Sequence, residues 1–126
     1  MKLVGVHVLL IEDVADIREV FAILLRSEGA DVAATGSGRE GAEMAKNGRF
    51  DVVLSDLGLP DISGEALIRQ LRAAAGNGTR VIVITGYGEP YLTRARQAGA
   101  DAVFTKPVEW TRILDYIRWP DLAASA

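Results

Sequence analysis

Val52-Val53-Leu54-Ser55-Asp56 is the stretch that decides the fold of this chain. It opens with apolar residues that do not alternate with polar ones, which is typical of a strand buried on both faces. Short runs of similar character recur along the sequence, at Val6–Ile11, Ala30–Ala34, Arg80–Ile84 and Asp101–Phe104. Strands of this kind form parallel sheets with helices on both sides, so the sequence predicts an α/β protein with five strands.

Segments with the spacing of amphipathic helices separate these strands. The clearest is Asp16–Glu28, where Ile17, Phe21 and Leu24 recur at helical intervals, and a last helix carries Ile113 and Ile117. Glycine often ends a helix by taking the left-handed conformation. We therefore expect such helix ends at Gly29, Asn47-Gly48, Gly76-Asn77-Gly78 and Gly99.

Right-handed crossovers leave few topologies for a chain of five strand-helix units. The common one at this length is flavodoxin-like (βα)5, a three-layer sandwich whose parallel sheet has the order 2-1-3-4-5 with helices on both faces. We expect this strand order because it is common, since the sequence itself does not show it. We expect one domain over residues 1–120 and a C-terminal tail over 121–126.

Composition narrows the class of protein. The chain has 126 residues, of which 49% are hydrophobic and 25% charged, which matches a globular domain. Its net charge of -3 gives no reason to expect binding to nucleic acid or to an anionic membrane. It has no cysteine, and no apolar run approaches the roughly 18 residues of a membrane span. We therefore expect a cytoplasmic protein.

Charged and hydroxyl side chains stand where the predicted strands end. Glu12 and Asp13 follow the first strand, Asp56 the third, Thr85 the fourth and Lys106 the fifth. In open α/β sheets, ligands bind at the carboxyl ends of the strands, so these side chains are expected to converge. Clustered carboxylates without histidine or cysteine favour a hard divalent cation, and we expect Mg²⁺.

Such a cluster suits phosphoryl transfer to an aspartate. With the metal bound, Asp56 can act as the nucleophile on an anionic phosphoryl donor, while Lys106 supplies a second positive charge. Thr85 can donate a hydrogen bond to a phosphoryl oxygen when its side chain rotates toward the site. Each residue alone is ambiguous, since carboxylates also cap helices and lysines often lie on surfaces.

Four motifs in the same order resemble the receiver domains of bacterial response regulators and hybrid histidine kinases. They are Leu9-Leu10-Ile11-Glu12-Asp13, Ser55-Asp56-Leu57-Gly58-Leu59-Pro60 with Gly64, Ile84-Thr85-Gly86, and Phe104-Thr105-Lys106-Pro107. The resemblance spans nearly the whole chain. It implies that Asp56 is the phosphoacceptor and that Thr85 and Lys106 contact the phosphoryl group. It also implies a cis peptide bond between Lys106 and Pro107, and Mg²⁺ ligands at Glu12, Asp13, Asp56 and the backbone carbonyl of Gly58.

The resemblance also implies partners. The phosphoryl donor would be phosphohistidine on a histidine kinase or a histidine phosphotransfer protein. Signalling would follow from a shift at the face formed by the fourth helix, fifth strand and fifth helix, which is also a candidate surface for a homodimer. The chain would be a signalling domain rather than an enzyme. The downstream target, and whether the domain is a stand-alone regulator or part of a hybrid kinase, stay open.

The sequence departs from the family pattern at its switch residues. Receivers usually carry tyrosine or phenylalanine three residues before the lysine, and here that residue is Val103. The neighbouring Phe104 is expected on the opposite face of its strand, because side chains alternate. Tyr87 lies two residues after Thr85, and we expect it to lean over the site and slow hydrolysis of the aspartyl phosphate.

Two other functions compete with this interpretation. A phosphohydrolase of the haloacid dehalogenase type also uses a nucleophilic aspartate, but it needs a second aspartate two residues later, where this chain has Gly58. A pseudo-receiver would act as a scaffold without being phosphorylated. Turnover of a phosphate ester would favour the first alternative, and failure to bind Mg²⁺ would favour the second.

Overall fold

The computed structural model describes residues 1–76 and 78–119 of the chain. Strands and helices alternate in the order β1 His7–Ile11, α1 Ala15–Ser27, β2 Asp31–Thr35, α2 Gly38–Asn47, β3 Val52–Ser55, α3 Gly64–Ala75, β4 Arg80–Thr85, α4 Tyr91–Ala98, β5 Ala102–Thr105 and α5 Trp110–Arg118. Within the described residues, every helix falls short of the length and apolar character that a membrane crossing requires. The predicted tail, 121–126, lies outside the described residues, so the domain boundary at residue 120 stays a prediction.

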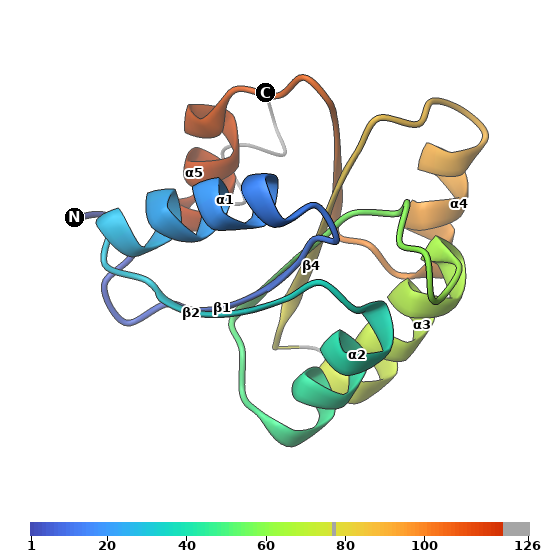
Figure 1. Ribbon diagram of the computed structural model, residues 1–126, viewed down its shortest axis with the longest axis horizontal. Helices are drawn as coiled ribbons and strands as arrows, with labels where there is room; N and C mark the ends of the chain where they lie inside the picture. The colour runs from blue at the N-terminus through green and yellow to red at the C-terminus, as the bar shows by residue number, and fades with distance from the viewer. Residues whose placement is uncertain (77, 120–126) are drawn as a thin grey trace.

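Within residues 1–76 and 78–119 the five strands are all parallel, and their order in the sheet is β2-β1-β3-β4-β5. Helices α1 and α5 lie on one face of the sheet and α2, α3 and α4 on the other, which makes three layers (Figure 1). The predicted α/β class and flavodoxin-like order are therefore confirmed. Ile11 pairs with Ser55, and Ser55 with Val83. The carboxyl ends of β1, β3 and β4 therefore lie close together along the same edge of the sheet.

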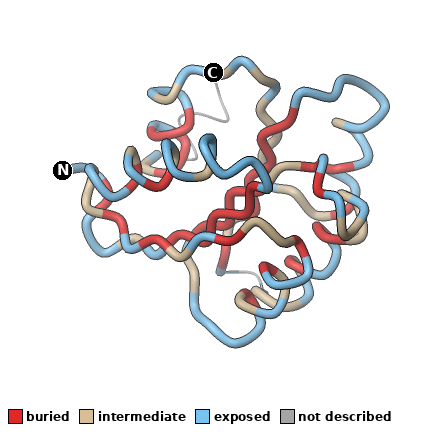
Figure 2. The backbone as a smooth tube through the Cα atoms, viewed as in Figure 1, coloured by how far each residue is buried: buried red, intermediate tan, exposed pale blue. Residues whose placement is uncertain are grey.

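Two apolar cores fill the spaces between the sheet and its helices, and the strand pleat divides residues between them. In β3, Val52 and Leu54 pack in the core under α1 and α5, whereas Val53 packs in the core under the other helices. The central strands run as a buried band through the molecule (Figure 2). This arrangement explains why the sequence of β3 does not alternate between apolar and polar residues, because both of its faces are covered.

The predicted helix ends are confirmed in part. Gly29, Gly76 and Gly99 have φ angles of 92°, 73° and 123°, in the region that favours glycine. The prediction of a left-handed conformation at Gly48 is wrong, since this residue lies in extended backbone with a φ of -113°. Its N–H still bonds the carbonyl of Met44, so α2 ends there without a left-handed residue. The β2 strand begins and ends one residue later than expected, at Asp31 and Thr35.

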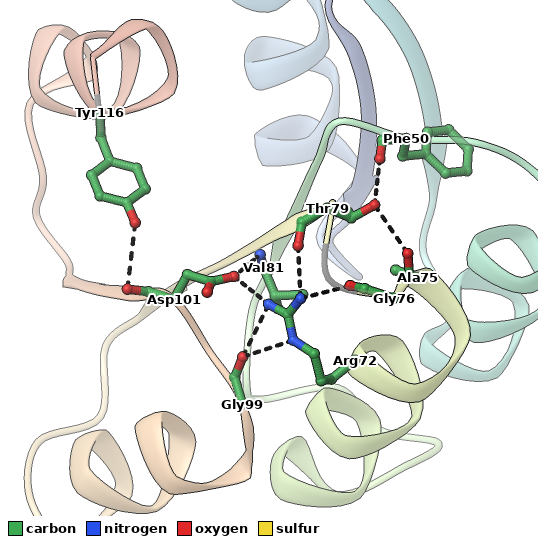
Figure 3. Close-up of polar contacts among 9 residues, drawn as sticks. All are labelled: Phe50, Arg72, Ala75, Gly76, Thr79, Val81, Gly99, Asp101 and Tyr116. Carbon is green, nitrogen blue, oxygen red and sulfur yellow. Dashed lines mark hydrogen bonds and ion pairs between the residues drawn. The ribbon is translucent and has the colours of Figure 1, made fainter. Parts of the chain in front are cut away.

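Arg72, near the end of α3, joins several segments at the amino edge of the sheet (Figure 3). Its guanidinium forms an ion pair with Asp101, just before β5, and the Asp101 carboxylate also accepts the N–H of Val81 at 2.7 Å. The same guanidinium donates hydrogen bonds of 2.8 to 3.3 Å to backbone carbonyls, those of Gly76, Thr79 and Gly99. One side chain therefore ties the end of α3 to the starts of β4 and β5.

Candidate functional site

Four of the predicted residues meet at the carboxyl edge of the sheet. Glu12 and Asp13 follow β1, Asp56 follows β3, and Lys106 follows β5. The three acids offer carboxylate oxygens that all lie within 4.8 Å of one another. Lys106 Nζ lies 3.2 Å from Asp56 Oδ2 and 3.4 Å from Glu12 Oε1. Segments more than ninety residues apart in the sequence therefore form one cluster.

The backbone that follows Asp56 orients its side chain. Asp56 Oδ1 accepts hydrogen bonds from the N–H groups of Leu57, at 2.7 Å, and Gly58, at 3.2 Å. Its other oxygen faces Lys106. The side chain is 16% exposed, so a donor at the surface can still reach it. Asp56 is thus held in position without being enclosed, which suits a nucleophile.

Glu12 is the most buried acid of the cluster, with 4% of its surface exposed. Burial raises the pKa of Glu12, the nearby charge of Lys106 opposes the rise, and the charge of Asp56 adds to it. Within the described part of the chain, Glu12 Oε2 is a buried side-chain oxygen without a hydrogen-bond partner. A buried carboxylate oxygen without a partner is costly, and a bound cation would remove that cost.

Lys106 compensates part of the negative charge. Burial lowers the pKa of Lys106, but its hydrogen bond to Asp56 and the charges of Asp56 and Glu12 outweigh that effect, so the pKa lies above its usual value. The ammonium is therefore held in its charged form between two carboxylates. The cis peptide bond predicted between Lys106 and Pro107 is present.

The donor set fits a hard divalent cation. The cluster offers only carboxylate oxygens as ligands, and Glu12, one of its three acids, has an unsatisfied Oε2. A cavity of about 10 Å³ is lined by Glu12, Asp56 and Lys106 among other residues. The N–H of Gly58 bonds Asp56, which places Gly58 beside the cluster, whereas its carbonyl as a metal ligand stays a prediction.

Thr85 ends β4 at the same edge and is fully buried. Thr85 Oγ1 accepts a hydrogen bond from the N–H of Tyr87 at 3.1 Å. The hydroxyl is only the acceptor in this bond, so its own hydrogen can still be donated to another oxygen. Its role as a hydrogen-bond donor to phosphate stays a prediction.

The residues at which the chain departs from the family pattern lie as follows. Val103 packs in the core under α2, α3 and α4, and Phe104 packs in the opposite core, so the predicted separation of the two is confirmed. Tyr87 is 49% exposed, and its ring lies 5.2 Å from that of Tyr91. A Cβ on Gly58 would lie 3.3 Å from the Tyr87 hydroxyl. Tyr87 therefore does stand beside the loop that follows Asp56.

The contacts between the loop that joins β3 to α3 and the start of α2 were not predicted from the sequence. The carboxylate of Asp61 accepts hydrogen bonds from the first residues of α2, and Ser37 caps that helix by accepting the N–H of Glu40. The pattern Ser37-Gly38-Arg39-Glu40 is a capping-box signature that could have revealed the start of α2. Nothing near Asp61 in the sequence indicates its partners, which precede it by more than twenty residues.

Comparison with known proteins agrees with this site. The family described as "Response regulator receiver domain" matches residues 8–118. The cell cycle transcriptional regulator CtrA of Caulobacter vibrioides is 38% identical over 102 residues, covering 80% of this chain and 44% of that protein. The chain spans less than half the length of the curated relatives compared, at 45% and 44%.

Solved receiver structures share the fold. A response regulator from Burkholderia pseudomallei, with a phosphorylated aspartic acid and a calcium ion, is 26% identical with a TM-score of 0.85, covering 96% of this chain and 70% of that one. The receiver domain of a sensor histidine kinase from Pseudomonas aeruginosa PAO1, with magnesium in its active site cleft, is 30% identical with a TM-score of 0.77, covering 88% of this chain and 95% of that one. Family match, strand order and acidic cluster agree, and the chain belongs to the response regulator receiver domains of two-component signalling systems.

Proposed function

We propose that Asp56 is the phosphoacceptor of this receiver domain and that its donor is phosphohistidine on a histidine kinase or histidine phosphotransfer protein. The observation that carries the proposal is the position of Lys106 Nζ, 3.2 Å from Asp56 Oδ2 inside a cluster of three acids. A cation at this position can neutralise charge that develops on a transferring phosphoryl group.

The transfer exchanges one bond to phosphorus for another. A carboxylate oxygen of Asp56 bonds to phosphorus as the P–N bond of phosphohistidine breaks. The electron pair of that bond returns to the imidazole, which is protonated on its other nitrogen and leaves as a neutral group. The N–H groups of Leu57 and Gly58 keep the Asp56 carboxylate aligned, and Lys106 donates to a phosphoryl oxygen.

Glu12, Asp13, Asp56 and the backbone carbonyl of Gly58 are the proposed ligands of Mg²⁺. When bound, the metal supplies charge neutralisation and orients the phosphoryl oxygens. The orphaned Oε2 of Glu12 supports this assignment. Glu12 and Asp13 would coordinate, while Lys106 would turn from the carboxylates toward the incoming phosphoryl group.

We propose that phosphorylation changes how this domain contacts other proteins. Rotation of Thr85 toward the phosphoryl group would break its bond to the N–H of Tyr87, which precedes α4. The face formed by α4, β5 and α5 is then the surface that a downstream protein, or a second copy of this chain, would recognise. We further infer a cytoplasmic location, no direct contact with nucleic acid or membrane, and no enzymatic activity beyond the phosphorylation and slow dephosphorylation of Asp56.

Intact mass spectrometry after incubation with acetyl phosphate and Mg²⁺ tests the proposal. We expect a gain of one phosphoryl group in the wild type and in Asp115→Asn, which alters an exposed carboxylate on α5, and none in Asp56→Asn. Omission of Mg²⁺ should abolish the gain. A folded, metal-binding protein that gains no mass from acetyl phosphate or from a phosphorylated histidine donor would overturn the proposal in favour of a scaffold.

A further inference from the structure

The loop between β3 and α3 is fastened to the start of α2 by one side chain, Asp61. Asp61 Oδ1 accepts the N–H of Gly38 at 3.1 Å, and Oδ2 accepts the N–H of Arg39 and the hydroxyl of Ser37, both at 2.9 Å. In the other direction, Arg39 Nε donates to the Asp61 carbonyl at 3.1 Å. Four hydrogen bonds thus cross between two segments that are more than twenty residues apart.

The junction is also closely packed. A Cβ on Gly38 would lie 2.4 Å from Ile62 Cγ2 and 3.1 Å from Leu59 Cδ1. Leu59 is 8% exposed and belongs to the core under α2 and α3. Leu59 and Ile62 therefore pack closely against the start of α2.

The charge of Asp61 strengthens the junction. The pKa of Asp61 lies below its usual value, chiefly because its carboxylate accepts the N–H of Arg39, with Gly38 and Ser37 adding to the effect against a smaller cost of burial. A negative charge at this position also faces the positive end of the α2 helix dipole. The carboxylate stays ionised at neutral pH and keeps its partners.

The same loop carries both backbone groups that hold Asp56. Leu57 and Gly58, whose N–H groups bond Asp56 Oδ1, lie between the strand end and the Asp61 junction. We propose that Asp61 is a positioning residue for phosphorylation, which fixes the backbone of residues 57–60 and so aligns Asp56 and the Gly58 carbonyl for the metal and the phosphoryl group. The inference rests on the proposed function of Asp56.

A merely structural role for Asp61 would look different. If Asp61 only stabilised α2, its loss would resemble the loss of Ser37, which caps the same helix through the N–H of Glu40. Ser37→Ala removes that cap and one of the four junction bonds, but leaves the bonds of Asp61 to the N–H groups of Gly38 and Arg39 in place. It is therefore the control for Asp61→Ala. Both variants should unfold at lower urea concentration than the wild type, and Asp61→Ala should disturb the site far more than Ser37→Ala.

Two readouts separate the alternatives. In metal-free protein, hydrogen exchange of the Leu57 and Gly58 amides should be faster in Asp61→Ala by about tenfold and much less affected in Ser37→Ala, which keeps three of the four junction bonds. In calorimetric titration with Mg²⁺, the dissociation constant should rise about tenfold in Asp61→Ala, the scale of losing an outer support of a metal site, and much less in Ser37→Ala. The rate of phosphorylation by acetyl phosphate at saturating Mg²⁺ should fall in the same variant, with Asp61→Glu closer to wild type than Asp61→Ala.

The outcomes are distinct. Equal exchange, metal affinity and phosphorylation rate in Asp61→Ala and Ser37→Ala would overturn the positioning role while leaving the phosphoacceptor assignment intact. Wild-type protein that takes up no phosphoryl group would instead refute the proposed function, and the exchange rates of the two amides would still report whether Asp61 holds the loop.

Discussion

The backbone N–H of Tyr87 donates a hydrogen bond to the hydroxyl oxygen of Thr85, with 3.1 Å between the two atoms. Thr85 is the last residue of β4 and is completely buried, whereas Tyr87 is half exposed. The bond therefore links the interior end of the strand to the surface loop that leads into α4. Because Val103 supplies no aromatic ring at the usual switch position, we infer that this link carries the response to phosphorylation if Asp56 is the phosphoacceptor as proposed.

Removal of the Thr85 hydroxyl should break the link between the end of β4 and the loop that leads into α4. Thr85→Val keeps the branched shape but loses the oxygen that accepts the Tyr87 N–H, so the chemical shift of the Tyr87 amide should no longer change upon phosphorylation. Thr85→Ser keeps the hydroxyl and should retain the change. The measurement is a pair of two-dimensional NMR spectra with and without acetyl phosphate and Mg²⁺. An equal response of the Tyr87 amide in both variants would exclude this role of the link.

Tyr87 should protect the aspartyl phosphate from water. Its hydroxyl would lie 3.3 Å from a Cβ on Gly58, beside the loop after Asp56. We expect Tyr87→Ala to shorten the lifetime of the phosphorylated form severalfold, because attacking water would gain access. The decay of phosphorylated protein can be followed by intact mass after the phosphodonor is removed. Tyr91→Ala, which removes the neighbouring ring, serves as the control, and an unchanged lifetime in Tyr87→Ala would disprove the role.

Lys106→Met should separate metal binding from phosphoryl transfer. The substitution removes the ammonium that lies between Glu12 and Asp56, so phosphorylation by acetyl phosphate should slow by a factor of about 10² or more, the scale of losing one preorganised charge. Mg²⁺ should bind at least as tightly as before, because a competing cation is gone. Calorimetry and mass spectrometry measure the two quantities. A variant with weaker metal binding but normal phosphorylation would contradict this division.

Glu12→Gln should stabilise the metal-free domain while it weakens the metal site. The pKa of Glu12 is raised in the folded state, so ionisation of Glu12 costs stability: its favourable contribution is present below its ordinary value of 4.5 and is lost as the pH rises through the folded pKa. At pH 7 the free energy of unfolding of the variant should therefore be higher than that of the wild type. The gain should disappear in acid. Urea titrations at several pH values without metal measure it, and a gain that persists in acid would refute this cause.

Arg72→Met should be strongly destabilising although it lies far from the site. Its guanidinium serves three backbone carbonyls and Asp101, and their loss should cost about 2–3 kcal/mol in free energy of unfolding. Arg72→Lys should recover part of this, since an ammonium cannot reproduce the planar fork. Arg69→Met, which removes an exposed pair with Glu65, should cost less than about 0.5 kcal/mol. Similar urea midpoints for Arg72→Met and Arg69→Met would contradict the role of Arg72.

The sequence predicted those features of the fold and of the site that depend only on the type of residue and on its place along a strand. Continuous apolar strands predict a covered parallel sheet, and residues that follow parallel strands must share an edge, so the meeting of Glu12, Asp13, Asp56 and Lys106 could be expected. The position of Phe104 followed from strand alternation alone. These inferences hold because they depend on the period of the backbone and not on the details of packing.

Contacts between loops could not be expected in the same way. The junction at Asp61 and the contacts of Arg72 depend on how helices and loops lie in space. The start of α2 has a local signature, but nothing in the sequence shows that Asp61 contacts it, and the partners of Arg72 have no signature of their own. Gly48 was predicted to be left-handed because glycine often is, yet α2 ends there with extended backbone. The bond between Thr85 and Tyr87 was also missed, because it depends on the path of the backbone after β4.

The division of β5 between two cores limits how this domain could regain the aromatic residue that other receivers use. Val103 and Phe104 are neighbours in the chain, but each fills a different space, one under α2 to α4 and the other beside Tyr116. Exchanging the two would place the larger side chain against the core under α2 to α4 and the smaller one beside Tyr116. Although a ring stands one residue away from position 103, it lies on the opposite face of the sheet and cannot take the place of one there.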